Sequence, residues 1–240
     1  MRPSLPDLAL GVFATMLIRA GRPLELERHL ERLRASAAAL YPEAGIEHLE
    51  TLAAEGARGV ACGRLRLTVA PNGSGRLRTD VLAAAVDPAA VLPGWDRAVR
   101  LAGLVVEGGL GAHKWADRRL LAGAEAAGGG AVPLVVDVDD CVLEASRANL
   151  FVVEDGTIVT PPADGRILPG VTRRRVLEIA AVREEPVSLA RLLAADEAFL
   201  TGSVRGVEPV YAYEHVRAWR RGEITAGVAD ALRSRWELDP

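Results

Sequence analysis

The chain has 240 residues, of which 50% are hydrophobic and 25% charged, and its formal net charge at pH 7 is −3. These values are typical of an ordinary globular protein with a sizeable core, and they exclude a strongly basic surface for nucleic acid. No apolar run is long enough to cross a bilayer, so no membrane association is expected. The two cysteines, Cys62 and Cys141, are far apart, with no CxxC motif and no histidine cluster. This pattern predicts reduced thiols, no metal site and a cytoplasmic protein.

The N-terminus allows two interpretations. Arg2 followed by LALGVFATMLI is similar to the basic and apolar parts of a secretory signal peptide. Against this, no small-residue cleavage site follows, and RAGRP is typical of a turn between a strand and a helix. We therefore expect a strand, followed by a helix over residues 24–40 whose leucines share one face.

The next elements predict a small first domain. We expect a helix over residues 46–58 and strands over 60–70 and 77–86. The turn PNGSG joins these strands as a hairpin, because it lacks the Lys-Ser/Thr of a phosphate-cradling loop. DPAAVLPG then breaks the pattern, so the sequence predicts a domain over 1–87, a linker over 88–94 and a second domain over 95–240.

One lysine is distinguished by its isolation. The chain has 29 basic residues, and Lys114 is the only lysine among them, in the glycine-flanked stretch GGLGAHKWADRRLL. Lysine can bond covalently to a carbonyl group and arginine cannot. The presence of this single lysine therefore favours a chemical role over a role as a surface charge.

The stretch from Cys141 to Arg175 combines strands with a potential anion site. VLEASRANLFVV is rich in strand-forming residues, and Asp155-Gly156 is a strong hairpin signal before TIVT. Gly170, Val171 and Thr172 then open an Arg-rich helix over residues 173–182. Backbone N–H groups, a hydroxyl and the positive end of a helix dipole meet there, which is the chemistry of a phosphate site.

The same stretch also carries a family signature. EASRANLF, IVT and LPGVTR, at these separations, resemble the motif of the class IV aminotransferases, the fold type IV enzymes that use pyridoxal 5′-phosphate (PLP). The match is unbroken from Glu144 to Arg173; taken alone, Glu144 would be a surface carboxylate at a strand edge. The resemblance implies an α+β fold, with a small N-terminal α/β domain and a larger C-terminal domain built on a mixed, barrel-like sheet.

The resemblance also implies which residues hold PLP. Lys114 would bind the cofactor covalently and act as general base and acid, while Glu144 would pair with the pyridine nitrogen. The element HLERL is similar to the part of the family that carries a phosphate-binding arginine, which here is Arg32. His29, on the same side of the helix, would support this arginine. The spacing of the two residues, taken alone, would instead predict a solvated His/Arg pair. The remaining implied cofactor contacts are Asn149, Leu168, Val171, Thr172 and, in FLTGSV, Ser203.

Within the family, several stretches are most similar to 4-amino-4-deoxychorismate lyases, which eliminate pyruvate to form 4-aminobenzoate, a folate precursor. They are GVFATMLIRAGRPLELERHLERL, GLGAHKWADRRLL and FLTGSVRGVEPV. This implies that Thr15 helps to protonate the departing pyruvate and that Phe13 lines the substrate pocket. The chain departs from these lyases at Ala14, which replaces a glutamate, and at Pro71-Asn72, which replace Arg-Gly. Arg64 or Arg66 is therefore the candidate for the substrate carboxylate.

Two alternatives remain open. One is an aminotransferase of branched-chain or D-amino acids, and the other is a non-catalytic homologue that binds PLP, against which the single lysine argues. In each enzymatic case the substrate is a small amino compound. The resemblance implies a homodimer, with pockets between the two domains and a loop supplied by the partner. The sequence also begins late relative to the family, which truncation or descent from a fused form would explain.

Overall fold

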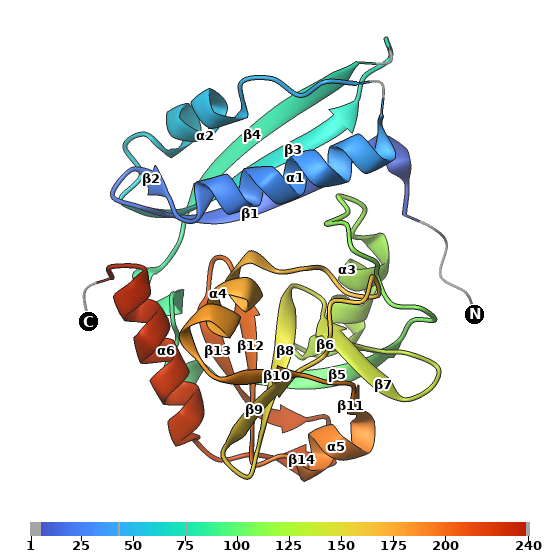
Figure 1. Ribbon diagram of the computed structural model, residues 1–240, viewed down its shortest axis with the longest axis vertical. Coiled ribbons are helices and arrows are strands. Elements are labelled where there is room, and N and C mark those ends of the chain that lie inside the picture. The colour runs from blue at the N-terminus through green and yellow to red at the C-terminus, as the bar shows by residue number, and fades with distance from the viewer. Residues whose placement is uncertain (1–5, 43, 75, 239–240) are drawn as a thin grey trace. The chain divides into compact units, whose positions relative to one another are not determined.

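A computed structural model describes residues 6–42, 44–74 and 76–238, which form two compact units (Figure 1). The N-terminal unit comprises residues 6–88 and 113–118, and the C-terminal unit comprises residues 89–112 and 119–238. Residues 113–118 lie inside the second domain by sequence, but they pack with the first unit because their backbone pairs with its first strand. Arg2, where the signal-like pattern begins, lies outside the described residues.

The N-terminal unit is a four-stranded antiparallel sheet with two helices. A short 3-10 helix, Leu8–Leu10, precedes the sheet, whose strands lie in the order β2-β1-β3-β4. Its elements are β1 (Val12–Arg19), β2 (Arg22–Pro23), α1 (Leu26–Leu40), α2 (Leu49–Ala57), β3 (Cys62–Pro71) and β4 (Leu77–Ala85). Helices were expected over 24–40 and 46–58, and both are confirmed with slightly later starts.

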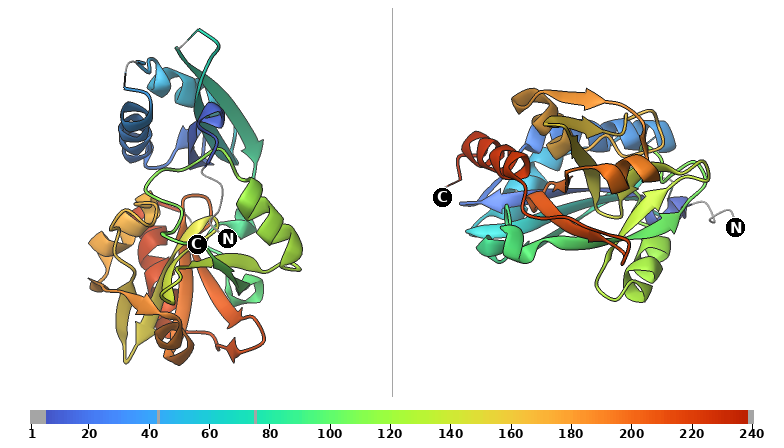
Figure 2. Two further views of the ribbon diagram at one scale, coloured as in Figure 1. Left: turned by 90° about the vertical axis from the view of Figure 1, so that its right-hand side faces the viewer. Right: turned by 90° about the horizontal axis from the view of Figure 1, so that it is seen from below.

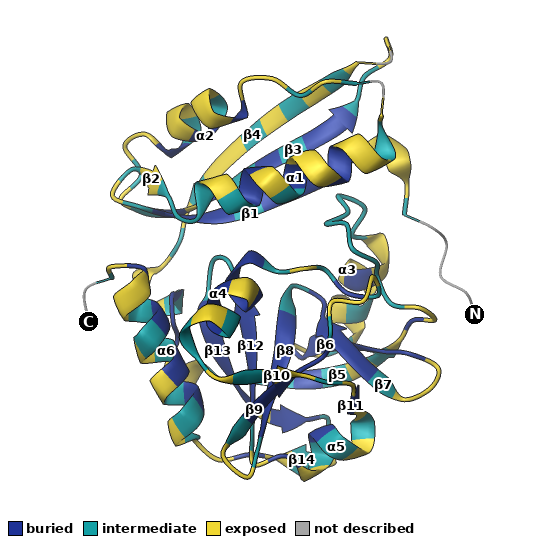
Figure 3. Cartoon of the chain, viewed as in Figure 1, coloured by how far each residue is buried: buried dark blue, intermediate teal, exposed yellow. Residues whose placement is uncertain are grey.

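The two faces of this sheet differ in character because side chains alternate along a strand. One face carries Val12, Met16 and Leu65, which pack with leucines and alanines of α1 and α2 into a core. The two helices lie on this one side of the sheet (Figure 2). The other face carries Phe13, Thr15 and the side chains paired with them on β3. The strands β1 and β3 are largely buried, whereas β4 is mostly exposed (Figure 3).

The C-terminal unit is built on a ten-stranded sheet, six strands of which close into a ring. The ring runs β8-β12-β13-β5-β6-β7 and closes because β7 also pairs with β8. Its strands are β5 (Val99–Val105), β6 (Val132–Val136), β7 (Cys141–Ala145), β8 (Ala148–Glu154), β12 (Glu197–Gly202) and β13 (Gly206–Tyr213). The strands outside the ring are β9 (Thr157–Thr160), β10 (Val182–Glu184), β11 (Val187–Ser188) and β14 (Arg217–Ala218). The expected α+β fold with a barrel-like sheet is confirmed.

Helices flank the ring of strands. They are α3 (Arg119–Ala127), α4 (Val171–Ile179), α5 (Leu189–Ala194) and α6 (Glu223–Arg235), and two short 3-10 helices lie at Pro88–Ala90 and Trp95–Arg97. The helix expected over 173–182 is wrong at both ends: it begins at Val171 and ends at Ile179, because Val182 starts a strand that pairs with β9. Asp155 and Gly156 both have positive φ and form the expected hairpin turn between β8 and β9. Among the described residues, none of these helices is long and apolar enough to span a membrane.

Candidate functional site

The carboxylate of Glu144 is buried and held by two neighbouring groups. Glu144 is only 5% exposed, which overturns the surface position suggested by its sequence context. One oxygen accepts the backbone N–H of Leu168 at 3.1 Å, and the other accepts the side-chain amide of Asn149 at 3.3 Å. The same amide donates to the Leu168 carbonyl at 2.9 Å. Asn149 and Leu168 therefore fix the orientation of a carboxylate that hydrogen bonds of this kind favour in its charged form.

The start of α4 lies directly against this arrangement. Gly170 caps the helix without a side-chain hydrogen bond, and a Cβ at this position would come within 2.0 Å of the Asn149 side-chain oxygen. Thr172 is 2% exposed, and its hydroxyl has no hydrogen-bond partner among the described residues. An unsatisfied buried hydroxyl is costly. At a helix N-terminus it fits an anion that would supply the acceptor.

A third polar residue completes a row across three strands. Glu144, Asn149 and Thr201 lie opposite one another on β7, β8 and β12, so their side chains share one face of the sheet. Thr201 is also buried and its hydroxyl lacks a partner among the described residues. The sequence indicated Ser203, which lies half-buried in the turn after β12, and gave no signal for Thr201.

The single lysine is fixed by its backbone to the first strand of the N-terminal unit. The carbonyl of Lys114 accepts the N–H of Phe13 at 2.9 Å, and Trp115 forms an antiparallel bridge with Val12. The Lys114 amine then lies 5.0 Å from the centre of the Phe13 ring. Lys114 is thus held beside β1, which also carries Thr15, two residues after Phe13.

Phe13, Thr15 and Arg66 share the face of the sheet that the helices leave uncovered. Thr15 pairs directly with Arg66, and the Arg66 guanidinium carbon lies 3.8 Å from the centre of the Phe13 ring. Burial, followed by the charges of Arg118 and Arg64, lowers the pKa of Arg66. The sequence could not choose between Arg64 and Arg66. In the structure Arg64 is exposed and opposite Leu17, whereas Arg66 is beside Phe13 and Thr15.

Helix α1 presents a polar stripe at positions 29, 32 and 36, which share one side of a helix. His29 is 1% exposed and its Nδ1 has no hydrogen-bond partner among the described residues. Burial, then the charges of Arg32 and Lys114, lower its pKa well below the usual value, so the imidazole is neutral. Ser36 lies 3.0 Å from Nδ1 of His113, the residue before Lys114. The stripe therefore contacts the lysine-bearing segment through Ser36, and the solvated His/Arg pair suggested by spacing is wrong for His29.

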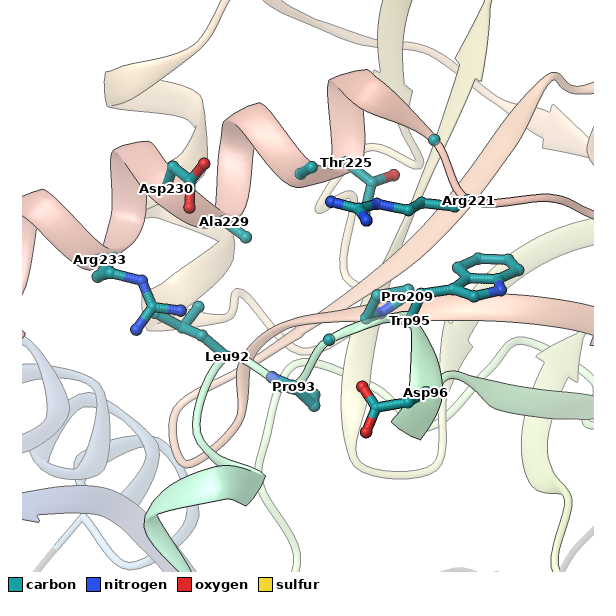
Figure 4. Close-up of a pocket in the computed structure, with 13 residues that line it drawn as sticks. Leu92, Pro93, Trp95, Asp96, Pro209, Arg221, Thr225, Ala229, Asp230 and Arg233 are labelled. Carbon is teal, nitrogen blue, oxygen red and sulfur yellow. The ribbon is translucent and has the colours of Figure 1, made fainter. Parts of the chain in front are cut away.

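A cavity of about 440 Å³ opens elsewhere in the C-terminal unit. It lies between α6, at Thr225, Ala229 and Arg233, and the segment that holds Leu92 and Trp95 (Figure 4). None of the residues assigned from the sequence lines it. Among the described residues, no three His, Cys, Asp or Glu side chains gather as they would around a metal ion.

Comparison with known proteins gives consistent results. Residues 11–213 match the protein family described as amino-transferase class IV. The branched-chain-amino-acid aminotransferase of Escherichia coli K12 is 33% identical over 106 residues, which is 41% of this chain but only 34% of that enzyme. The chain therefore matches about a third of this relative's length.

Two solved structures extend the comparison to almost the whole chain. A hypothetical aminotransferase of Mycobacterium tuberculosis in its PLP-bound form has a TM-score of 0.84 at 23% identity, covering 98% of this chain and 95% of the other. The 4-amino-4-deoxychorismate lyase of Pseudomonas aeruginosa has a TM-score of 0.77 at 29% identity, covering the same shares of the two chains.

A substitution at Gly170 tests the packing around Glu144. In Gly170→Ala the new methyl group would displace the Asn149 side chain and disturb its hydrogen bonds, so we expect a loss of about 1–3 kcal/mol of stability. Gly123→Ala on α3 is the matched control, because a Cβ there meets no atom within 4 Å. That control should be neutral or gain up to about 1 kcal/mol. Urea unfolding of both variants measures the difference, and equal stabilities would contradict the close contact.

The neutral state of His29 predicts a pH dependence. Its folded-state pKa lies below the unfolded value of 6.5, so the unfolded chain binds an extra proton at acidic pH. The contribution of neutral His29 to the free energy of unfolding is complete above pH 6.5. It is lost as the pH falls, by up to about 1.4 kcal/mol per pH unit. His29→Asn should flatten the unfolding free energy between pH 7 and 5. Urea unfolding of the native protein and of this variant at each pH measures the slope, and equal slopes would contradict a buried neutral His29.

Proposed function

Because the chain belongs to the class IV aminotransferase family, whose cofactor is PLP, we propose that it is a 4-amino-4-deoxychorismate lyase. The observation that carries the proposal is the shared face of Phe13, Thr15 and Arg66 beside the Lys114 amine. It offers a hydroxyl, a cation and an amine together, as an elimination from an anionic amino substrate requires. The 29% identity to the Pseudomonas aeruginosa lyase, over 95% of that chain, supports the same reaction.

The residues of the C-terminal unit fit the ring and phosphate of PLP. Glu144 would keep the pyridine nitrogen protonated, since an opposite charge stabilises the charged form of each partner, and Asn149 with Leu168 would hold it in place. The backbone of Val171 and the hydroxyls of Thr172 and Ser203 would hold the phosphate. The unsatisfied hydroxyl of Thr172 at the start of α4 supports this fit.

The residues of the N-terminal unit would carry the reaction. PLP, when bound, withdraws electrons from the substrate carbon that loses a proton. Lys114 would bind the cofactor covalently and then take that proton, while Arg32 would add a charged hydrogen bond to the phosphate. Thr15 would give a proton to the carbon of the departing pyruvate. Arg66, whose described contacts are Thr68 and Phe13 and include no carboxylate, would bind a carboxylate of the substrate.

A transaminase is the second candidate. The 33% identity to the Escherichia coli branched-chain-amino-acid aminotransferase favours it, although this match spans 41% of the chain. A transaminase of branched-chain or D-amino acids would use Lys114 and Glu144 in the same way. It differs in returning the proton to the cofactor through the lysine, so that Thr15 has no task. We propose a homodimer for either reaction.

One experiment separates the two reactions. The purified protein with PLP is offered 4-amino-4-deoxychorismate, and separately L- and D-amino acids with 2-oxoglutarate or pyruvate. Release of 4-aminobenzoate and pyruvate supports the lyase. Formation of a new amino acid without 4-aminobenzoate would overturn the lyase and favour the transaminase. If the protein binds PLP but forms neither product, it is a homologue that binds PLP without catalysing either reaction.

Lys114→Arg tests the covalent role while preserving the charge. Arginine cannot form the bond to PLP, so turnover should fall to a trace and borohydride should no longer attach the cofactor to the chain. In the native protein the label should appear at Lys114, because no other side chain of the sequence carries a primary amine. Mass spectrometry of the reduced protein locates the label. A label elsewhere, or retained turnover, would show that Lys114 is not the reactive residue.

Thr15→Val tests the proton donor. Valine keeps the β-branched shape that suits a strand and removes only the hydroxyl. Formation of 4-aminobenzoate should fall by roughly a hundredfold, as for a lost general acid. PLP content and melting temperature should remain as in the native protein. Full lyase activity in this variant would mean that Thr15 only packs in its strand.

A further inference from the structure

A buried carboxylate in the C-terminal unit binds two arginines that come from different turns. Glu208 on β13 is 2% exposed. Both its oxygens accept from Arg147, at 3.0 and 3.1 Å, and one also accepts from Arg205 at 3.0 Å. A charge this deeply buried is stable only when it is paired, and two cations satisfy it here.

The two arginines belong to the turns that adjoin the proposed cofactor residues. Arg147 lies in the tight turn between β7 and β8, three residues after Glu144. Arg205 lies in the turn between β12 and β13, two residues after Ser203. Glu208 therefore links the hairpin of the ring-binding carboxylate to the turn of a phosphate-binding hydroxyl.

The second turn has two further supports. The Arg205 carbonyl accepts the N–H of Leu92 at 2.9 Å. Gly206 has a φ of +66°, and a Cβ there would lie 2.4 Å from the Leu92 side chain. The turn is thus fixed at its backbone near Leu92 and at its Arg205 side chain by Glu208. The Ser203 end of the turn follows the last pair of the β12–β13 ladder, Gly202 with Gly206.

An ion cluster of this kind contributes little net stability compared with apolar residues of the same volume, because the charged groups lose hydration when they are buried. Its geometry is nonetheless restrictive: a bidentate arginine pair fixes both distance and plane. The cluster is therefore better suited to fixing the positions of the two turns than to stabilising the unit.

We propose that Glu208 is a positioning residue that holds the Ser203 turn, through Arg205, in the conformation that binds the phosphate of PLP. The proposal depends on the phosphate-binding role of Ser203 in the proposed function. Without the carboxylate, Arg147 and Arg205 would repel each other and the turn would lose its link to the hairpin. Phosphate affinity should then fall, while the contacts to the pyridine ring persist through Glu144.

The test compares PLP with pyridoxal, which has the same ring and no phosphate. In Glu208→Gln and in Arg205→Gln, the dissociation constant of PLP should rise roughly tenfold, equivalent to one charge-assisted hydrogen bond. The dissociation constant of pyridoxal should stay within about twofold of the native value, since one phosphate hydrogen bond is not involved. Arg205→Gln, at a half-exposed side chain, decides the question if Glu208→Gln does not fold.

Glu154→Gln is the matched control. It also breaks a bidentate pair with an arginine, Arg191, in the same unit but on a strand end that carries no proposed cofactor residue. Its PLP affinity should equal that of the native protein. A loss there as large as in Glu208→Gln would overturn the proposal, because any broken ion pair would then suffice.

Ser203→Ala completes a double-mutant cycle with Glu208→Gln. If Glu208 acts through Ser203, the double variant should bind PLP no more weakly than Ser203→Ala alone. Additive losses, or equal losses for PLP and pyridoxal, would overturn the positioning role while leaving the proposed function intact. If Ser203→Ala binds PLP normally, the phosphate role of Ser203 is wrong and the positioning role falls with it; the lyase assay remains an independent test of the reaction.

Discussion

The hydrogen bonds between Glu144, Asn149 and Leu168 are the constraint on which the proposed cofactor site of the C-terminal unit depends. They join the β7–β8 hairpin to the loop that leads into α4, so one contact fixes both a carboxylate and the start of a helix. Gly170 makes this possible because only a residue without a side chain allows the helix to begin against Asn149. A negative group and a positively polarised helix end are consequently held close together, which suits a cofactor with a cationic ring nitrogen and an anionic phosphate.

The N-terminal unit holds the Lys114 amine beside the strand that carries Phe13 and Thr15. Its sheet uses one face for a core with α1 and α2 and leaves the other for Phe13, Thr15 and Arg66. The lysine is attached to this face by backbone pairing with β1, through the Lys114 carbonyl and the N–H of Phe13. The ring of Phe13 lies beside the Arg66 guanidinium and the Lys114 amine. The face of an aromatic ring attracts cations weakly.

Electrostatics around this lysine favour anions. Arg66 has its pKa lowered by burial and by neighbouring arginines, and buried His29 stays neutral beside Arg32 and Lys114. Arg66 and Lys114 therefore bring positive charge to one side of the N-terminal sheet, and the imidazole of His29 adds none at neutral pH. The lyase and the transaminase would both use this field. The two reactions would differ in the task of individual groups such as the Thr15 hydroxyl, because one fold can host several reactions.

The sequence alone determined the features that depend on local pattern: the helices α1 and α2, the Asp155-Gly156 hairpin, and the isolation of Lys114. The family motif also indicated Glu144 and Thr172 as site candidates. The residues next to them in the sequence did not reveal that both side chains are buried. Only the tertiary structure placed Arg66 opposite Thr15 and Arg64 opposite Leu17, packed residues 113–118 with the first unit, and showed that His29, Thr201 and Glu208 are buried. The reason is physical. Periodicity reports which residues share a face of one element, whereas the register between strands and the burial of a charge arise from contacts between residues far apart in the chain.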